Sequence, residues 1–292
     1  MKFTNDREFP SELQEFLTYS DYNMSGTRFD ISATKLLDSP QVAAFWKSHG
    51  KDVVEDSAGR VYSSMGSGIH SRYEAANASN PEVVMEKRFM SEFAHPIVGS
   101  DPLVVSGQID SYNFKTKTLA DLKTVSVWKI IKQDYVSFEK QLNICALLMK
   151  MNGFEVEKLQ VYALIRDWSR GRTGENNYPS TNIQVIDIEM WDEQEQQDYI
   201  ADRLELHFGE GEKLCSDEER WARPGSFAVK QTSKKRALRL LPTMEKAESW
   251  CKSQGHTIGE KGISIEERPA TYMRCNDYCS FKQWCPQYKS ST

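Results

Sequence analysis

The chain has 292 residues, with 37 Lys and Arg against 42 Asp and Glu, which gives a formal net charge of −5. Hydrophobic residues make up 39% of it and include 13 Phe, 12 Tyr and 7 Trp, so a disordered or low-complexity chain is excluded. No stretch approaches the ~20 consecutive apolar residues that span a bilayer. The acidic balance excludes a generic nucleic-acid coat, so any contact with DNA must come from a local basic surface.

The chain ends carry two further signals. The first ten residues, MKFTNDREFP, hold acids where a secretory signal needs an apolar run, so we expect a cytoplasmic protein. Six Cys are too few for a disulfide scaffold in a chain of this length and would stay reduced in that compartment. Three of them fall within residues 275–292, and this clustering needs its own explanation.

Hydrophobic periodicity predicts alternating helices and strands. The expected helices are 33–46, capped by Ser32; one that begins near Ser63 or Ser64 and carries His70; 136–151, ended by Gly153; and 244–252. The expected strands are 83–89, 103–110, 118–124, 159–166 and 183–190, with a turn over 112–117. This order predicts an α/β protein with a mixed β-sheet flanked by helices.

We expect the chain to have three parts. They are an N-terminal helical segment (1–62), a core (63–191) and a C-terminal extension (192–292) that is helical and Cys-rich and packs on the core. The extension opens with an acidic stretch, 192–219, for which a solvated helix is the ordinary interpretation.

Two acids and a lysine form the first candidate for chemistry. If the strands around the turn pair as a hairpin, Asp110 and Asp121 come side by side. Lys123 lies two residues after Asp121 and shares its face, while Leu122 points the other way, into the core. Paired carboxylates repel unless a divalent cation neutralises them, and oxygen ligands of this kind suit Mg²⁺ or Mn²⁺. The ordinary alternative is two exposed acids and a surface lysine, since D-x-K is very common.

Neighbouring segments favour the metal site. The four segments read Gly66-x-x-x-His70, Gly107-x-x-Asp110, Asp121-x-Lys123 and Gln141-x-x-x-Cys145. In order and spacing they resemble the motifs of the PD-(D/E)XK nucleases, RecB-like branch, whose last motif ends in Tyr. The resemblance implies a restriction-endonuclease-like core and an Mg²⁺- or Mn²⁺-dependent deoxyribonuclease.

The resemblance also implies a role for each matching residue. It makes His70, Asp110 and Asp121 metal ligands, with the Leu122 carbonyl as a further one. Lys123 would act on the nucleophilic water and Gln141 would support the site, which makes Asp110, Asp121, Lys123 and Gln141 the implied catalytic residues. Cys145 stands where the family has Tyr, so the role of that hydroxyl is not carried over.

Two further acids are weaker candidates. Glu74 follows His70 by one helical turn and could bind a second metal or a water, although a surface acid is as common there. Glu86 lies on an expected strand and could simply pair with Lys87 or Arg88.

The second half of the chain resembles a group of phage and prophage nucleases of the same branch. It contains a basic group that could grip a DNA backbone, or equally form a solvated turn: Lys234, Lys235, Arg236 and Arg239. The resemblance places the protein in a bacterium or a phage-infected host cell, in DNA recombination, repair or phage DNA processing. A recombination or replication protein would be a possible partner.

The cysteine cluster at the end of the chain has two interpretations. Cys275, Cys279 and Cys285 could fill core gaps as reduced thiols, or bind a structural metal as zinc or a [4Fe–4S] cluster. Some RecB-like nucleases hold such a cluster with a C-terminal triplet, but Ser39-Pro40 stands where their first ligand lies. Cys215 is the best substitute for that ligand, followed by Cys251 and His256.

Three functions fit the sequence. The leading one is a metal-dependent DNA exonuclease. The second is a non-catalytic DNA-binding or assembly protein that keeps the fold, against which the intact Asp110, Asp121 and Lys123 argue. The third is a nuclease that acts on RNA. The sequence does not give polarity, strand preference or oligomeric state.

Overall fold

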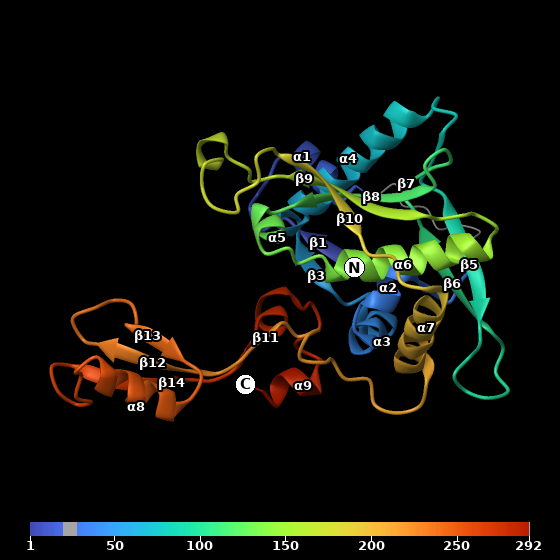
Figure 1. Ribbon diagram of the computed structural model, residues 1–292. Coiled ribbons are helices and arrows are strands. Elements are labelled where there is room, and N and C mark those ends of the chain that lie inside the picture. Colours follow the sequence, from blue (N-terminus) through green and yellow to red (C-terminus); the bar gives the residue numbers. More distant parts are fainter. Residues whose placement is uncertain (20–27, 292) are drawn as a thin grey trace. The chain divides into compact units, whose positions relative to one another are not determined.

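A computed structural model describes residues 1–19 and 28–291 (Figure 1). The chain divides into two compact units, Met1–Lys213 and Leu214–Thr292. The first unit contains the N-terminal segment and extends past residue 191, the boundary that the sequence suggested, because helix α7 (Glu193–Phe208) buries Ile200 and Leu204 in the main core. Among the described residues, no helix combines the length and apolarity needed to cross a membrane.

The first unit is a mixed α/β structure, as predicted, with two principal sheets. One is five-stranded in the order β10-β9-β8-β7-β4, and the other is three-stranded in the order β2-β6-β5. Their strands are β2 (Ile31–Ser32), β4 (Val83–Met85), β5 (Arg88–Phe93), β6 (Leu103–Gln108), β7 (Ser111–Asn113), β8 (Thr118–Val125), β9 (Lys158–Ile165) and β10 (Ile183–Ile188). In the larger sheet β8 and β9 are parallel and the other pairs are antiparallel.

The chain passes between the two sheets at two adjacent points. It leaves β4 for β5 at Glu86, and it leaves β6 for β7 at Asp110. Backbone hydrogen bonds from Glu86 N to Asp110 O and from Ile109 N to Lys87 O, both 3.0 Å long, hold the two crossings together. Glu86 has φ 47°, a conformation that a strand cannot include. The single strand predicted over 83–89 is therefore two strands.

The same crossing corrects two neighbouring expectations. The strand predicted over 103–110 ends at Gln108, before the crossing. The turn predicted over 112–117 is shorter than expected, because β7 takes Ser111–Asn113 and pairs with β8.

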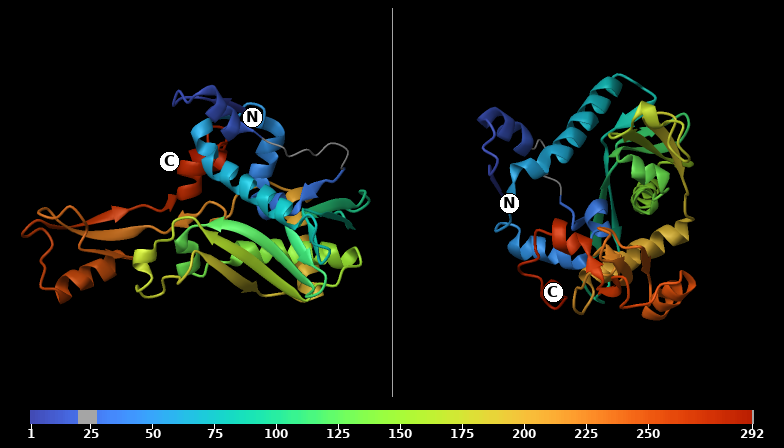
Figure 2. Two further views of the ribbon diagram at one scale, coloured as in Figure 1. Left: turned by 90° about the horizontal axis from the view of Figure 1, so that it is seen from above. Right: turned by 90° about the vertical axis from the view of Figure 1, so that its left-hand side faces the viewer.

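Two long helices cover opposite faces of the larger sheet, α4 (Val61–Asn77) and α6 (Val136–Met151) (Figure 2). α6 is the central core helix, and the predicted spacing of Phe138, Leu142, Cys145 and Met149 is confirmed, since all four are buried. Gly153, with φ 81°, follows its end, as predicted. α4, in contrast, has no buried residue.

The helix predicted over 33–46 is two helices, α2 (Ala33–Leu37) and α3 (Pro40–His49). Ser32 caps α2 as predicted, since its hydroxyl accepts a hydrogen bond from Lys35 N at 3.3 Å. A proline disfavours helical backbone at the residue before it, and Ser39 accordingly has ψ 132°. Pro40 then starts α3.

The remaining elements of the first unit are short. They are β1 (Lys2–Thr4), α1 (Ser11–Thr18), β3 (Val54–Asp56), η1 (Ser57–Arg60), α5 (Val127–Ile131) and η2 (Arg170–Arg172).

The second unit has its own small core. Its elements are β11 (Ala222–Arg223), β12 (Ser226–Gln231), β13 (Arg239–Leu241), α8 (Met244–Ser253), β14 (Ile263–Arg268), β15 (Thr271–Tyr272), η3 (Arg274–Tyr278) and α9 (Pro286–Lys289). Val229, Ala247, Cys251 and Ile263 are buried together between α8 and the sheet β13-β12-β14. The helix predicted over 244–252 is confirmed by α8.

Candidate active site

The candidate site forms at the point along β8 where its pairing with β7 ends. β9 pairs with β8 over its whole length, from Thr118 to Val125, but β7 pairs with it only as far as Ala120. The chain leaves that edge at Asp110, towards the other sheet. The Asp110 carboxylate takes the place of a strand, because its Oδ2 accepts a hydrogen bond of 2.7 Å from Leu122 N.

Asp121 and Lys123 form a buried ion pair beside this edge. Lys123 Nζ lies 3.0 Å from Asp121 Oδ1 and 2.8 Å from Oδ2. The Gln141 amide, on α6, donates to Asp121 Oδ1 at 3.1 Å. The Asp121 side chain is only 7% exposed, so the pair is held by the fold and is not a mobile surface contact.

The alternation along β8 is as predicted, and both faces of the strand are buried. Leu119 and Val125 share the Asp121 face, and both belong to the main core. Leu122 is buried on the other face, beside Tyr162 of β9. The catalytic candidates therefore point to the α6 side, where most of the core lies, and Leu122 points away from it.

Three side chains from three elements converge next to this pair. His70 on α4, Glu86 at the first crossing and Asp110 at the second each offer a ligand atom, and these atoms lie within 4.8 Å of one another. His70 Nδ1 is 3.5 Å from both Glu86 Oε1 and Asp110 Oδ1. Gln108 supports Glu86 by donating to its Oε2 at 2.7 Å.

The charges of this cluster are unbalanced without a cation. Burial, together with the charge of Asp121, raises the pKa of Asp110 from 3.8 to about 7. The contact with Glu86 raises the pKa of His70 in spite of its partial burial. Burial works against the ionised form of Glu86, but its contacts with His70 and Gln108 lower its pKa overall. Protons on Asp110 and His70 thus offset charge that a metal ion could balance.

Lys123 stays charged in this setting. Burial favours the neutral amine, but Asp121 outweighs it and the pKa of Lys123 is raised. The residue is therefore a fixed cation at the site, and not a free base.

The donor set fits a divalent cation. Glu86 Oε1 is buried and accepts no hydrogen bond from any described residue, which leaves a lone pair aimed at the cluster. Two carboxylates suit Mg²⁺ or Mn²⁺, and an imidazole is a better ligand for Mn²⁺ than for Mg²⁺. Asp121 lies outside the three-residue group, engaged by Lys123 and Gln141.

The structure also separates the two weaker acids. Glu74 is exposed and lies outside the cluster, whereas Glu86 is one of its three members. The sequence pattern indicated a possible metal or water ligand at Glu74 and only an ion pair with Lys87 or Arg88 at Glu86. The signal that would have found Glu86 is the pairing of the two crossings, which sets it opposite Asp110 and appears only once the strand register is known.

Gly107 and Cys145 show how closely α6 approaches the site. A Cβ atom at Gly107 would lie 2.9 Å from Leu148 Cδ1 and 3.1 Å from Cys145 Sγ, so a larger residue does not fit without a shift. Burial raises the pKa of the Cys145 thiol to about 12, so it remains protonated. Cys145 acts as a small apolar filler between helix and strand.

The other predicted residues lie in the second unit. Lys234, Lys235 and Arg236 are exposed on the connection from β12 to β13, and Arg239 is exposed at the start of β13. Cys251 belongs to the apolar core of that unit, away from the role of metal ligand.

The cysteines of the tail form a looser group. Cys275 and Cys285 are buried, and both contribute to raising the pKa of Cys279, after burial. Cys215 is held beside α9 by two hydrogen bonds between its backbone and the Gln287 amide, 3.1 and 2.9 Å long. Among the described residues, no three cysteines place their sulfur atoms within 4.8 Å of one another.

The first prediction concerns the proton on Asp110 in metal-free protein. Its folded-state pKa, about 7, lies above the ordinary 3.8, so the folded state binds this proton more tightly and loses stability as pH rises from about 4 to 7. The Asp110→Asn substitution replaces the carboxyl group with an uncharged amide of nearly the same shape as the protonated carboxyl. In EDTA the variant should melt near the wild-type temperature at pH 4 and several degrees higher at pH 8, since one pKa unit corresponds to about 1.4 kcal/mol.

The matched control for this experiment is Asp101→Asn, at an exposed aspartate of the same unit, which should follow the wild type at both pH values. Identical melting curves for Asp110→Asn and the wild type at pH 8 would show that the carboxylate is not destabilised by its surroundings.

Comparisons with known proteins give distant structural similarities. No family model and no curated protein matches the chain. Similar solved structures include SSO0001, with a TM-score of 0.44 and 18% identity over an alignment that covers 67% of this chain and 82% of the other. They also include the alkaline exonuclease LHK-Exo of Laribacter hongkongensis, with a TM-score of 0.28 and 14% identity over 47% of this chain and 62% of the other. A third is a phage-related exonuclease of Haemophilus somnus 129PT, with a TM-score of 0.30 and 11% identity over 68% of this chain and 76% of the other. At these TM-scores the function has to be inferred from the site itself.

Proposed function

We propose that the protein is a metal-dependent nuclease of the PD-(D/E)XK superfamily, RecB-like branch, and specifically an exonuclease that hydrolyses phosphodiester bonds in DNA. The observation that supports this most is the convergence of His70, Glu86 and Asp110 beside the buried Asp121–Lys123 pair. Carboxylates that repel one another and share protons are costly to bury, and such arrangements cluster at functional sites.

His70, Glu86 and Asp110 would hold Mg²⁺ or Mn²⁺, and Asp121 and the Leu122 carbonyl are the further ligands that the motif implies. A bound cation would lower the pKa of a coordinated water and offset negative charge on the phosphate in the transition state. The protein contributes the positions of these groups. Asp110 is fixed by Leu122 N, Glu86 by Gln108, and Asp121 by Gln141.

Lys123 stabilises charge in this scheme. Because Asp121 keeps it protonated, its ammonium group would attract the attacking water or the phosphate oxygens rather than remove a proton. Gln141 positions the Asp121 carboxylate from the α6 side by donating to Oδ1, while Lys123 contacts both of its oxygens.

The alternatives from sequence remain distinguishable by experiment. A non-catalytic DNA-binding protein would bind DNA and cleave none of it with either metal, and a ribonuclease would prefer RNA of the same sequence. For the DNA exonuclease, the setting we propose is the cytoplasm of a bacterium or of a phage-infected host cell, in recombination, repair or phage DNA processing.

The second prediction tests the proposed chemistry. Asp121→Asn and Lys123→Ala should each lower cleavage of end-labelled linear DNA by roughly 100-fold or more, since each removes a group that stabilises the transition state. The exposed ion pair between Lys158 and Asp187, 3.1 Å long in the same sheet, is the matched control, and its variants should cleave normally. Wild-type cleavage should stop in EDTA and return with Mn²⁺ or Mg²⁺. Full activity of Asp121→Asn, free of contaminating nuclease, would contradict the assignment.

The third prediction concerns two glycines inside α4. Glycine within a helix costs about 1 kcal/mol relative to alanine. A Cβ atom at Gly66 or at Gly68 would meet nothing within 4 Å, so no packing among the described residues requires either glycine. Gly66 lies one turn before His70 on the same face of the helix, whereas Gly68 faces elsewhere. Open space beside His70 is where a DNA backbone would approach the site.

Alanine at the two positions should therefore have different effects. Both Gly66→Ala and Gly68→Ala should raise the melting temperature by improving helix propensity. Only Gly66→Ala should weaken DNA cleavage, chiefly through a higher KM. Equal activity of the two variants would mean that the substrate does not pass over Gly66.

The fourth prediction concerns the cysteines of the tail. Cys275 and Cys285 are buried, as small thiols that fill gaps in a core would be. We therefore expect reduced, metal-free thiols, and an anaerobically purified protein that is colourless, free of zinc and unchanged in melting temperature by a chelator. Absorbance near ~400 nm with bound iron, or about one zinc per chain, would establish the structural metal instead.

A further inference from the structure

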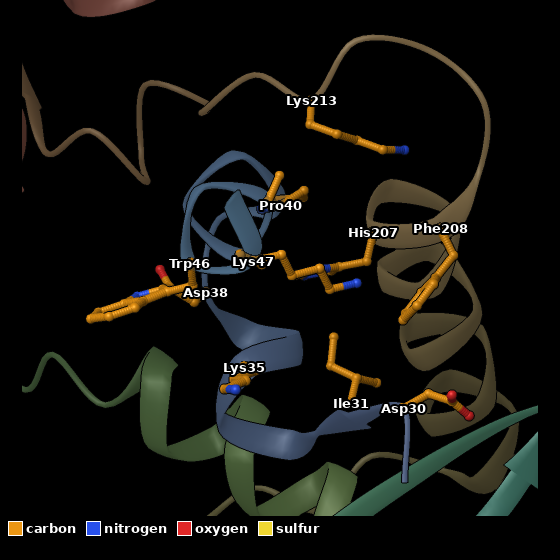
Figure 3. Close-up of a pocket in the computed structure, with 12 residues that line it drawn as sticks. Asp30, Ile31, Lys35, Asp38, Pro40, Trp46, Lys47, His207, Phe208 and Lys213 are labelled. Atoms are coloured by element: carbon orange, nitrogen blue, oxygen red, sulfur yellow. The ribbon is translucent and has the colours of Figure 1, made fainter. Parts of the chain in front are cut away.

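A second pocket lies away from the candidate active site, within the first unit. It has a volume of about 610 Å³ and is bounded by α2, α3 and the C-terminal end of α7 (Figure 3). Pockets of roughly 300–1,000 Å³ commonly hold small organic ligands. The nuclease mechanism proposed above does not use its residues.

The pocket carries positive charge that has no carboxylate partner. The pocket is lined by three lysines that approach it from different sides, Lys35, Lys47 and Lys213. None of the three forms an ion pair with a described carboxylate. Lys213 Nζ donates only to a backbone oxygen, that of Gly209, at 2.7 Å. Asp30 and Asp38 also line the pocket, but their carboxylates accept hydrogen bonds of 2.8 Å from Val104 N and from Ser39 N. The pocket therefore favours an anionic ligand.

Aromatic and aliphatic groups make up much of the remaining wall. Phe208, the last residue of α7, faces Lys47, whose Nζ lies 5.3 Å from the ring centroid. Trp46 extends on the opposite side of the pocket and is 38% exposed (Figure 3). Ammonium groups interleaved with aromatic rings are the combination with which proteins bind single-stranded nucleic acid, the rings stacking on bases and the cations contacting phosphates.

The pocket shares helix α2 with the candidate active site. A smaller pocket of about 200 Å³ adjoins Glu86 and Asp110 and is lined by Thr34, whereas the larger pocket is lined by the next residue, Lys35. Both residues belong to α2, so the two pockets lie against the same short helix. A strand that reaches the cluster could continue over α2 into the larger pocket.

We propose that this pocket binds one or two nucleotides of a single DNA strand whose scissile phosphate lies at the candidate active site. The inference rests on the proposed nuclease function. In it, Lys35, Lys47 and Lys213 contact phosphates and Phe208 stacks on a base. An acidic peptide would satisfy the lysines equally well, but continuity with the active site across α2 favours the nucleic acid.

The test is metal-free binding of a fluorescein-labelled oligothymidylate, followed by anisotropy in EDTA over a range of salt concentrations. The triple variant Lys35→Ala/Lys47→Ala/Lys213→Ala should bind at least tenfold more weakly, and its salt dependence should be shallower by about 2, since each phosphate contact contributes about 0.7 for single strands. Phe208→Leu, which keeps the apolar volume, should lower affinity by roughly fivefold or more. Lys51→Ala, at an exposed lysine just after α3 and outside the pocket, is the matched control.

The outcomes separate this proposal from the nuclease proposal, because the binding assay needs no cleavage. Wild-type affinity and an unchanged salt slope in the triple variant overturn the pocket proposal, even if the protein cleaves DNA. Binding of an oligoglutamate peptide that competes with the oligonucleotide more tightly than DNA binds also overturns it, in favour of an acidic protein partner. Loss of oligonucleotide binding in the triple variant supports it, even if no metal makes the wild type cleave.

Discussion

The candidate site depends on one constraint, the parting of β7 from β8 at Asp110. A strand edge with unsatisfied N–H groups is costly to bury, and here a carboxylate supplies the missing acceptor by binding Leu122 N. That hydrogen bond fixes Asp110 close to Asp121, and the paired crossing of the neighbouring strand brings Glu86 alongside. Three carboxylates are thus gathered by backbone geometry rather than by attraction between the side chains. The repulsion that results is one that a bound cation could relieve.

Protons and a lysine carry part of that charge in the metal-free protein. Lys123 neutralises Asp121, while the raised pKa values of Asp110 and His70 favour the protonated forms of both groups. A divalent ion entering there would displace those protons, so its affinity would rise with pH. The same burial that destabilises the empty site would strengthen every electrostatic contact with a bound phosphate. Under the proposed nuclease function, the cost in stability and the capacity for catalysis would have one physical origin.

Local patterns predicted much of the architecture, because they depend on neighbours in sequence. The Ser32 cap, the buried face of α6 and the shared face of Asp121 and Lys123 follow from helical and strand periodicity. Tertiary packing decided the rest. Periodicity separates the two faces of β8 and correctly predicts that Leu122 is buried, but it does not say that the main core covers the Asp121 face as well. The residues next to Glu86 in the sequence do not indicate its left-handed backbone conformation. The extent of the first unit depends on Ile200 and Leu204, which pack into a core formed by much earlier residues.

Helix α4 carries part of the candidate site but packs loosely on the rest of its unit. It buries no residue, yet it carries His70, the only imidazole of the cluster. Its contacts with other described elements include hydrogen bonds from Tyr73 Oη to Ser111 Oγ at 3.0 Å and from Ser64 Oγ to Leu17 O at 3.1 Å, and the Arg166 guanidinium over the Tyr62 ring. The contacts of His70 with Glu86 and Asp110 add to these. A metal ion shared by the three would bind α4 to both strand crossings, so ion binding and the ordering of this helix should be thermodynamically coupled.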